Sequence, residues 1–229
     1  MYRLITANRN YSSWSLRPWV LMRTLEIPFD DKVVTFAGLD NYAEFRSFSP
    51  SGMVPALIDG DCTVWDSLGI TLYLADRHDR VWPDGAAQAW AQCVGCEMHG
   101  GFSALRNDCT MNVGVRVRRH PDSDALKRDV ARIAEIFEEG LERFGGPYLG
   151  GSDFSAADAF FAPVVFRVRT HGLEVGPLGQ SWVERMLALP AMRAWEEQAL
   201  NEPYREAGHE AFLAAAGLVI EDHRVKADA

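Results

Sequence analysis

The chain has 229 residues, enough for one large domain or two modest ones, and we expect two. Apolar residues make up 48% and charged residues 24% of the chain, which supports a buried core and excludes a disordered protein. The net charge of −9 repels phosphate, so we expect no nucleic acid or membrane partner and favour a small neutral or electrophilic ligand.

No uninterrupted apolar run reaches the roughly 18 residues that a membrane span needs, and Met1 leads straight into a strand-like segment. We therefore expect a cytoplasmic protein. Four cysteines are too few for a disulfide framework in a chain of this length, so we expect them to be reduced.

The first 80 residues alternate between strand-like and helical patterns in the order βαβαββα. Pro18 requires the first helix to begin near residues 13–15, because an interior proline breaks the helical hydrogen-bond ladder. An Asp-Gly turn at Asp59 separates the two strands of a hairpin. The expected segments are strand 2–7, helix 14–25, strand 31–36, helix 42–48, hairpin 55–65 and a helix from 66 to about 78.

Long helical patterns replace the strand signals after the Trp-Pro-Asp-Gly sequence at 82–85. We therefore expect an N-terminal α/β domain over residues 1–80 and an all-helical domain over residues 86–229. The arginine-rich stretch 116–120 is expected to be a solvated loop. The expected helices cover 86–109, 124–144, 156–170, 181–188 and 191–200.

Three motifs in the first domain resemble those of the cytosolic glutathione S-transferases. Asn10-Tyr11-Ser12-Ser13-Trp14-Ser15 resembles the serine stretch of zeta-type members. The segment Ser49–Leu57 is similar to the family's Asn-Pro-x-x-x-Val-Pro-x-Leu, and Asp66-Ser67 stands where the family has an acidic residue or glutamine before serine. The resemblance implies a thioredoxin-like N-terminal domain followed by an all-α C-terminal helical bundle, and a homodimer.

The loop containing Met53, Val54 and Pro55 is implied by this resemblance to bind glutathione. Pro55 is expected to follow a cis peptide bond, so that the Val54 amide and carbonyl pair with the cysteinyl backbone of glutathione. Asp66 and Ser67 begin a helix, where outward-pointing amides and the dipole favour an anion. We expect this helix end to hold the γ-glutamyl carboxylate, with Asp66 available to the ammonium group.

Ser12 aligns with the catalytic serine of the family. A hydroxyl donating to sulfur, together with the helix N-terminus, would stabilise the glutathione thiolate. Ser13 is the second candidate, and Ser15 and the phenol of Tyr11 remain alternatives. The other possibility is that the serines only cap the helix, which would leave a noncatalytic glutathione-binding protein.

The electrophile is expected to lie between the first domain and the helical region around residues 99–111. His99, Phe102, Arg106, Met111 and Tyr11 are the candidates for lining this pocket. The first helix lacks the zeta-type cysteine at Trp14, so conjugation is favoured over isomerisation of maleylacetoacetate, which stays as an alternative activity.

Two further motifs are expected to be structural. Cys93-Val94-Gly95-Cys96 has redox-pair spacing but does not follow the first strand, so we expect buried thiols and no metal site. Ser155 and Asp158 form a helix capping box, so Asp158 is expected to act in folding and not in catalysis.

Overall fold

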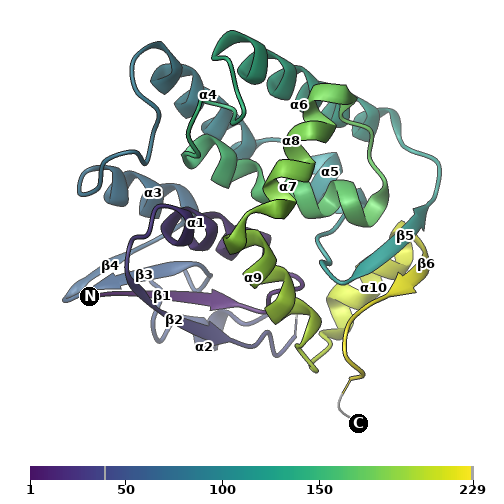
Figure 1. Cartoon of the computed structure of the whole chain (residues 1–229). Helices are drawn as coiled ribbons and strands as arrows, with labels where there is room; N and C mark the ends of the chain where they lie inside the picture. The colour runs from purple at the N-terminus through teal and green to yellow at the C-terminus, as the bar shows by residue number, and fades with distance from the viewer. Residues whose placement is uncertain (39, 228–229) are drawn as a thin grey trace.

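A four-stranded mixed sheet forms the N-terminal part of the protein in the computed structural model, which describes residues 1–38 and 40–227 (Figure 1). The strand order is β2-β1-β3-β4, with β1 parallel to β2 and antiparallel to β3. The strands are β1 (Tyr2–Ala7), β2 (Phe29–Val34), β3 (Ala56–Asp59) and β4 (Cys62–Val64).

Helices connect these strands in the predicted order βαβαββα, which is confirmed. α1 (Ser13–Thr24) begins within the expected window, and α3 (Ser67–Ala75) follows the hairpin. β2 lies two residues earlier than expected because its pairing with β1 runs from Phe29 to Val34. α2 (Tyr42–Phe45) is a single turn.

Seven helices follow among the described residues. The stretch 86–109, expected as one helix, is divided: a Cβ on Gly101 would lie 2.8 Å from the Glu97 carbonyl oxygen, so this glycine permits the break. The helices are α4 (Ala86–Gly100), α5 (Ser103–Asp108), α6 (Asp124–Arg143), α7 (Ala156–His171), α8 (Gly176–Ala188), α9 (Pro190–Leu200) and α10 (Ala207–Ala216).

The C-terminal part is not purely helical, because β5 (Val115–Arg119) pairs antiparallel with β6 (Gly217–Asp222). The expectation of a solvated loop at 116–120 is therefore wrong. Val115 and Val117 are buried while Arg118 points to solvent, which is the two-residue alternation of a half-buried strand. Figure 1 shows β5, β6 and α10 gathered beside one end of the N-terminal sheet.

One hydrophobic cluster extends through both parts of the chain. α1 is buried along most of its length and packs against α7 and α9. Trp19 of α1 meets Trp195 of α9 edge-to-face at 5.2 Å, and the Trp195 indole donates to the Arg9 carbonyl at 2.9 Å. This packing fixes the start of α1, and the serines there, against the helical part.

The predicted capping box begins α7. The Ser155 hydroxyl accepts from the Ala157 amide, and the Asp158 carboxylate accepts from the Ser155 amide at 3.0 Å. Asp158 is fully buried and also accepts from the Leu149 amide and the Trp182 indole. It therefore ties three segments together, as expected of a folding residue.

His171 at the end of α7 makes the stability of the fold sensitive to acid. Its Nε2 lies 2.8 Å from the Thr110 carbonyl, its Nδ1 has no partner among the described residues, and burial lowers its pKa to about 4. The unfolded chain binds this proton near pH 6.5, so the stability contributed by the neutral ring is lost as pH falls from about 6.5 to 4.

Between about pH 7.5 and 5.5 this loss amounts to about 1.3 kcal/mol. His171→Gln keeps a donor but does not titrate, so its unfolding free energy should fall less than that of the wild type by about this amount. Urea unfolding of both proteins at the two pH values measures the difference. Equal losses in both proteins would show that His171 does not carry this pH dependence.

The cysteines differ from the expectation. Cys93 and Cys96 are exposed on α4, so the prediction that they are buried is wrong, whereas Cys109 is buried and burial raises its pKa to about 11.

Across the described residues, no helix combines the length and apolar character required to cross a bilayer.

Candidate functional site

A cavity of about 700 Å³ is lined by residues from both parts of the chain. The N-terminal part contributes the turn before α1, the beginning of α1, and the segments around α2 and Val54. The helical part contributes α5 and its following loop, α7 and α10. The lining residues are Tyr11, Ser12, Ser13, Trp14, Phe36, Asp40, Asn41, Tyr42, Phe45, Gly52, Met53, Val54, Arg106, Asn107, Thr110, Met111, Arg167, His209 and Phe212.

The serines at the beginning of α1 have different partners. Ser12 is the N-cap residue, yet its side chain makes no capping bond and donates instead to Ser15 Oγ at 2.7 Å. Ser15 is fully buried, and its Oγ accepts from the Ala7 amide at 3.3 Å. Ser13 Oγ accepts from Arg167 Nη2 at 3.4 Å. Ser12 and Ser13 line the cavity, whereas Ser15 supports Ser12 from behind.

The loop before β3 forms another part of the lining. The Val54–Pro55 peptide bond is cis, as the resemblance implied. Gly52 has a φ of +66°, and a Cβ there would overlap the Tyr42 ring, so this position favours glycine. The Met53 side chain is exposed. Val54 and Met53 line the cavity, while Pro55 lies outside its lining.

Asp66 and Ser67 lie at the beginning of α3 and are not among the lining residues of this cavity. The Asp66 carboxylate accepts from the Leu68 amide at 2.9 Å, so it caps the helix while half of its side chain remains exposed. His99 Nε2 lies 3.3 Å from the second carboxylate oxygen, and burial lowers the pKa of His99. The His99 ring therefore lies against the Asp66 carboxylate and restricts its orientation.

The Ser67 side chain is fully buried, and its Oγ accepts from Arg17 Nη1 at 3.4 Å. The Arg17 guanidinium lies 4.2 Å from the centre of the Trp14 ring. Trp14 thus contacts the guanidinium that bonds to Ser67, and it also lines the cavity.

Only some of the residues predicted for the electrophile pocket line the cavity. Arg106 and Met111 line the cavity, whereas His99 and Phe102 do not. Phe102 is buried in the core with left-handed backbone angles at the N-cap of α5. The sequence interpretation missed Trp14, Arg167 and His209, and also the apolar residues Phe36 and Phe212.

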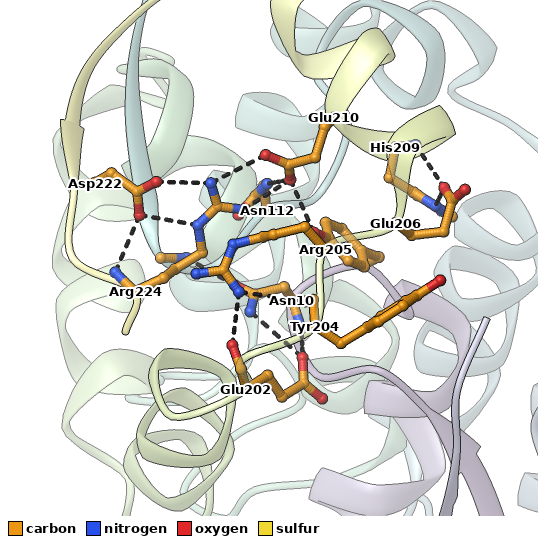
Figure 2. Close-up of polar contacts among 12 residues, drawn as sticks. Asn10, Asn112, Glu202, Tyr204, Arg205, Glu206, His209, Glu210, Asp222 and Arg224 are labelled. Atoms are coloured by element: carbon orange, nitrogen blue, oxygen red, sulfur yellow. Dashed lines mark hydrogen bonds and ion pairs between the residues drawn. The ribbon is translucent and has the colours of Figure 1, made fainter. Parts of the chain in front are cut away.

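The C-terminal segment 202–224, here called the C-terminal clamp, makes polar contacts with Asn10 and Asn112 (Figure 2). Glu210 accepts hydrogen bonds from Tyr11 Oη at 2.8 Å, Asn112 Nδ2 at 3.1 Å and Arg224 Nη1 at 2.7 Å. Although burial opposes it, the bonds from Arg224 and Tyr11 hold the pKa of Glu210 below its usual value. Glu202 accepts from the backbone amide of Asn10.

Tyr11 is held by this clamp. Burial and the neighbouring Glu210 raise the pKa of its phenol. The protonated phenol donates a hydrogen bond to the Glu210 carboxylate. The His209 ring stacks on Tyr11 at 4.8 Å and on Phe36 at 5.3 Å. Tyr11 therefore presents a ring to the cavity, with its hydroxyl committed to the clamp.

Two family models match the chain. The model "Glutathione S-transferase, N-terminal domain" matches residues 11–77, and "Glutathione S-transferase, C-terminal domain" matches residues 122–198. Together they span more than half of the chain, and the first contains both the serines of α1 and the Val54–Ser67 segment.

Several known proteins are similar to this chain over most of their length. Glutathione S-transferase GstB of Escherichia coli K12 is 24% identical over 206 residues, covering 81% of this chain and 93% of the relative. A probable maleylacetoacetate isomerase of Vibrio cholerae is 24% identical over 192 residues, covering 79% and 89%.

Solved structures share the fold. A glutathione transferase homologue from Burkholderia BGR1, with bound glutathione, has a TM-score of 0.65 at 20% identity and covers 86% of this chain and 97% of its own. A theta class enzyme from Xanthomonas axonopodis, also with glutathione bound, has a TM-score of 0.63 at 21% identity and covers 88% and 98%.

Proposed function

The chain belongs to the glutathione S-transferase family, and from this membership we propose that it binds glutathione as a co-substrate and activates the thiol for attack on a small electrophile. One observation carries the proposal: Ser12, Val54 and the helical residue Arg106 line the same cavity. A cysteinyl group paired with the Val54 backbone places its sulfur toward the beginning of α1. The electrophile then approaches from the helical side.

The glutathione thiol has a pKa near 8.5 when free, so only a few per cent is thiolate at pH 7. We assign its stabilisation to the Ser12 hydroxyl. Ser12 donates to Ser15 Oγ at 2.7 Å in the structure, and a hydroxyl proton can rotate toward another acceptor. When thiolate is bound, the Ser12 hydroxyl turns from Ser15 and donates to sulfur. The N-terminal amides of α1 add a favourable partial charge.

The reaction is a nucleophilic displacement or addition. For an aryl halide, the thiolate sulfur forms a bond to the ring carbon, the carbon–halogen bond breaks, and halide leaves with the electron pair. The thiol proton goes to solvent when the thiolate forms. The cavity residues supply position and charge stabilisation, and no residue is required to become covalently modified.

The γ-glutamyl end of glutathione is assigned to the beginning of α3. In this assignment the amides at the start of α3 and Ser67 donate to the γ-glutamyl carboxylate, and Asp66, half of whose side chain is exposed, accepts from the ammonium. His99 acts here as a positioning residue, because its Nε2 lies 3.3 Å from the Asp66 carboxylate and restricts the carboxylate's orientation.

Asp66→Asn tests this assignment without removing the helix cap, since asparagine caps as well as aspartate. We expect the Kd for glutathione to rise about tenfold, because a charge-assisted bond to the ammonium is lost. Cysteinylglycine lacks the γ-glutamyl group, so its Kd should not change. Calorimetric titration measures both, with Asp61→Asn on the exposed β3–β4 turn as a control. Equal weakening of both ligands would contradict the assignment.

Turnover of 1-chloro-2,4-dinitrobenzene and of maleylacetone by the wild-type protein tests the activity. Conjugation of the aryl halide supports the proposed transfer reaction. Isomerisation of maleylacetone alone would favour the isomerase activity named for the V. cholerae relative. Glutathione binding without turnover of either compound would indicate a noncatalytic binding protein.

A further inference from the structure

Two arginines line the helical side of the cavity. Arg106 lies on α5, and Arg167 lies on α7 with only 5% of its surface exposed. Both side chains are held by backbone carbonyls: Arg167 Nε donates to Cys109 at 2.9 Å, and Arg106 Nε donates to Gly101 at 3.0 Å. Neutral oxygens therefore fix the two guanidinium groups in place without cancelling their charge.

Neither of these arginines forms an ion pair with any residue that the structure describes. Burial and the neighbouring charge of Arg106 lower the pKa of Arg167 to about 9. Desolvating a cation without a counter-ion is costly, so buried guanidinium groups usually have carboxylate partners. The cavity wall thus carries positive charge that the chain itself leaves unneutralised.

Two arginines elsewhere in this protein follow the usual rule. Arg9 lies 2.5 Å from the Asp31 carboxylate, and Arg224 lies 2.7 Å from Glu210. Of the three buried arginines among the described residues, Arg17 and Arg167 have no carboxylate partner, and half-buried Arg106 and Arg116 also have none. Arg17 and Arg106 lie 4.2 and 4.9 Å from the Trp14 ring centre, and Arg167 contacts the adjacent Ser13.

The lining residues include one carboxylate, that of Asp40. Asp40 lies in the exposed segment before α2, where it accepts a hydrogen bond from the Tyr42 amide at 3.0 Å. No hydrogen bond or ion pair joins the Asp40 carboxylate to Arg106 or Arg167. The overall charge of −9 therefore does not describe the cavity, whose helical wall is locally cationic.

We propose that the electrophilic substrate of this cavity carries a carboxylate, which Arg106 and Arg167 bind while its reactive carbon faces the thiol. This inference rests on the proposed function and specifies its substrate class. The Nη1 group of Arg106 makes no hydrogen bond to the described residues, and only one long bond of 3.4 Å engages Nη1 of Arg167. Both forks therefore keep donors for a ligand.

A glutathione thiolate would neutralise only one positive charge, and a guanidinium fork matches the two oxygens of a carboxylate better than a single sulfur. The apolar part of such a substrate has Met111, Phe36 and Phe212 available in the same lining. These contacts accommodate an aromatic or alkenyl carboxylic acid better than an uncharged hydrocarbon.

Binding of two thioethers tests the proposal without the thiolate. S-benzylglutathione and S-(4-carboxybenzyl)glutathione differ by one carboxylate, and neither carries charge on sulfur. For the wild-type protein we expect the carboxylated thioether to bind at least tenfold more tightly by calorimetric titration. Equal affinities, or preference for the uncharged thioether, would overturn the proposal while leaving glutathione binding intact. Failure of both thioethers and of glutathione to bind would instead refute the proposed function.

Arg167→Gln and Arg106→Gln should each reduce the carboxylate preference about tenfold. Arg118→Gln is the matched control, because Arg118 is an exposed arginine of β5 outside the cavity lining, and it should keep the full preference. Thermal unfolding verifies that each variant is folded, and Arg106→Gln keeps the test valid if Arg167→Gln fails to fold. Unchanged preference in both folded variants would contradict the assignment.

Turnover gives an independent readout. The ratio of kcat/KM for 4-chloro-3,5-dinitrobenzoate to that for the corresponding benzamide, corrected for uncatalysed rates, should exceed ten in the wild type and fall in the arginine variants. If the arginines stabilised only the thiolate, the arginine variants would turn over both substrates more slowly by the same factor. The pH profile would then shift without a change in the ratio of the two kcat/KM values. That outcome would also overturn the proposal.

Discussion

Ser12→Ala is expected to lower kcat/KM with 1-chloro-2,4-dinitrobenzene about 100-fold near pH 7, because removing one donor to a reacting anion has effects of this size. The pKa of the bound glutathione thiol should rise toward its value of about 8.5 in free glutathione. The rising limb of the pH–rate profile should therefore move to higher pH. The Kd for glutathione should change less than about threefold, since Val54 and Asp66 still hold the peptide.

Ser13→Ala is the matched control for Ser12→Ala. Both side chains line the cavity and both are almost fully buried, but Ser13 Oγ pairs with Arg167 and Ser12 Oγ pairs with Ser15. Ser15→Ala should have an intermediate effect of about tenfold or less, because it removes only the hydroxyl that orients Ser12. A larger loss in Ser13→Ala than in Ser12→Ala would transfer the role to Ser13. Loss of all glutathione binding in Ser12→Ala would contradict the assignment.

Asp158→Ala is expected to lower the free energy of unfolding by about 4 kcal/mol, through loss of the capping box and of buried hydrogen bonds. The amides of Leu149 and Ser155 and the indole of Trp182 would each lose their acceptor. A loss of this size in a chain of this length lowers Tm by about 10 °C. Differential scanning calorimetry measures the change.

Asp158→Asn is the graded control, because it keeps one acceptor oxygen and the side-chain volume, and it should lose less stability than Asp158→Ala. Asp158 lies outside the cavity lining, so kcat measured well below the new Tm should stay close to that of the wild type. A large fall in kcat for folded Asp158→Ala would show that this carboxylate takes part in the chemistry after all.

Local sequence patterns were sufficient to predict the N-terminal elements. The Asp-Gly turn at 59–60 and the serines at the start of α1 each depend on a few neighbouring residues, and the structure has the expected hairpin and helix start there. The cis bond before Pro55 was implied by the resemblance of its segment to the family motif, and the structure has it. The capping box of α7 is local in the same sense.

Contacts between distant segments could not be predicted in this way. Tyr11 meets Glu210 across 199 residues, and Ser13 meets Arg167 across 154. No short sequence motif predicts either contact. β5 was missed because its arginines dominate the composition and hide the alternation of Val115 and Val117, whose partner strand lies about 100 residues later.

The positive charge of the cavity wall could not be predicted from residues considered one at a time in the sequence. Arg106 was expected in the pocket, but its unneutralised charge becomes evident only when Arg167 is placed beside it and the carboxylates are found elsewhere. Net charge is a property of the whole chain, whereas selectivity depends on the few charges around the ligand.

A crystal structure of the protein with glutathione bound tests the central claim most directly. We expect the cysteinyl backbone to pair with Val54, and the sulfur to lie within hydrogen-bonding distance of Ser12 Oγ in the cavity shared with Arg106. Sulfur placed beside Tyr11 or Ser13 and away from Ser12, or glutathione bound outside this cavity, would contradict the account.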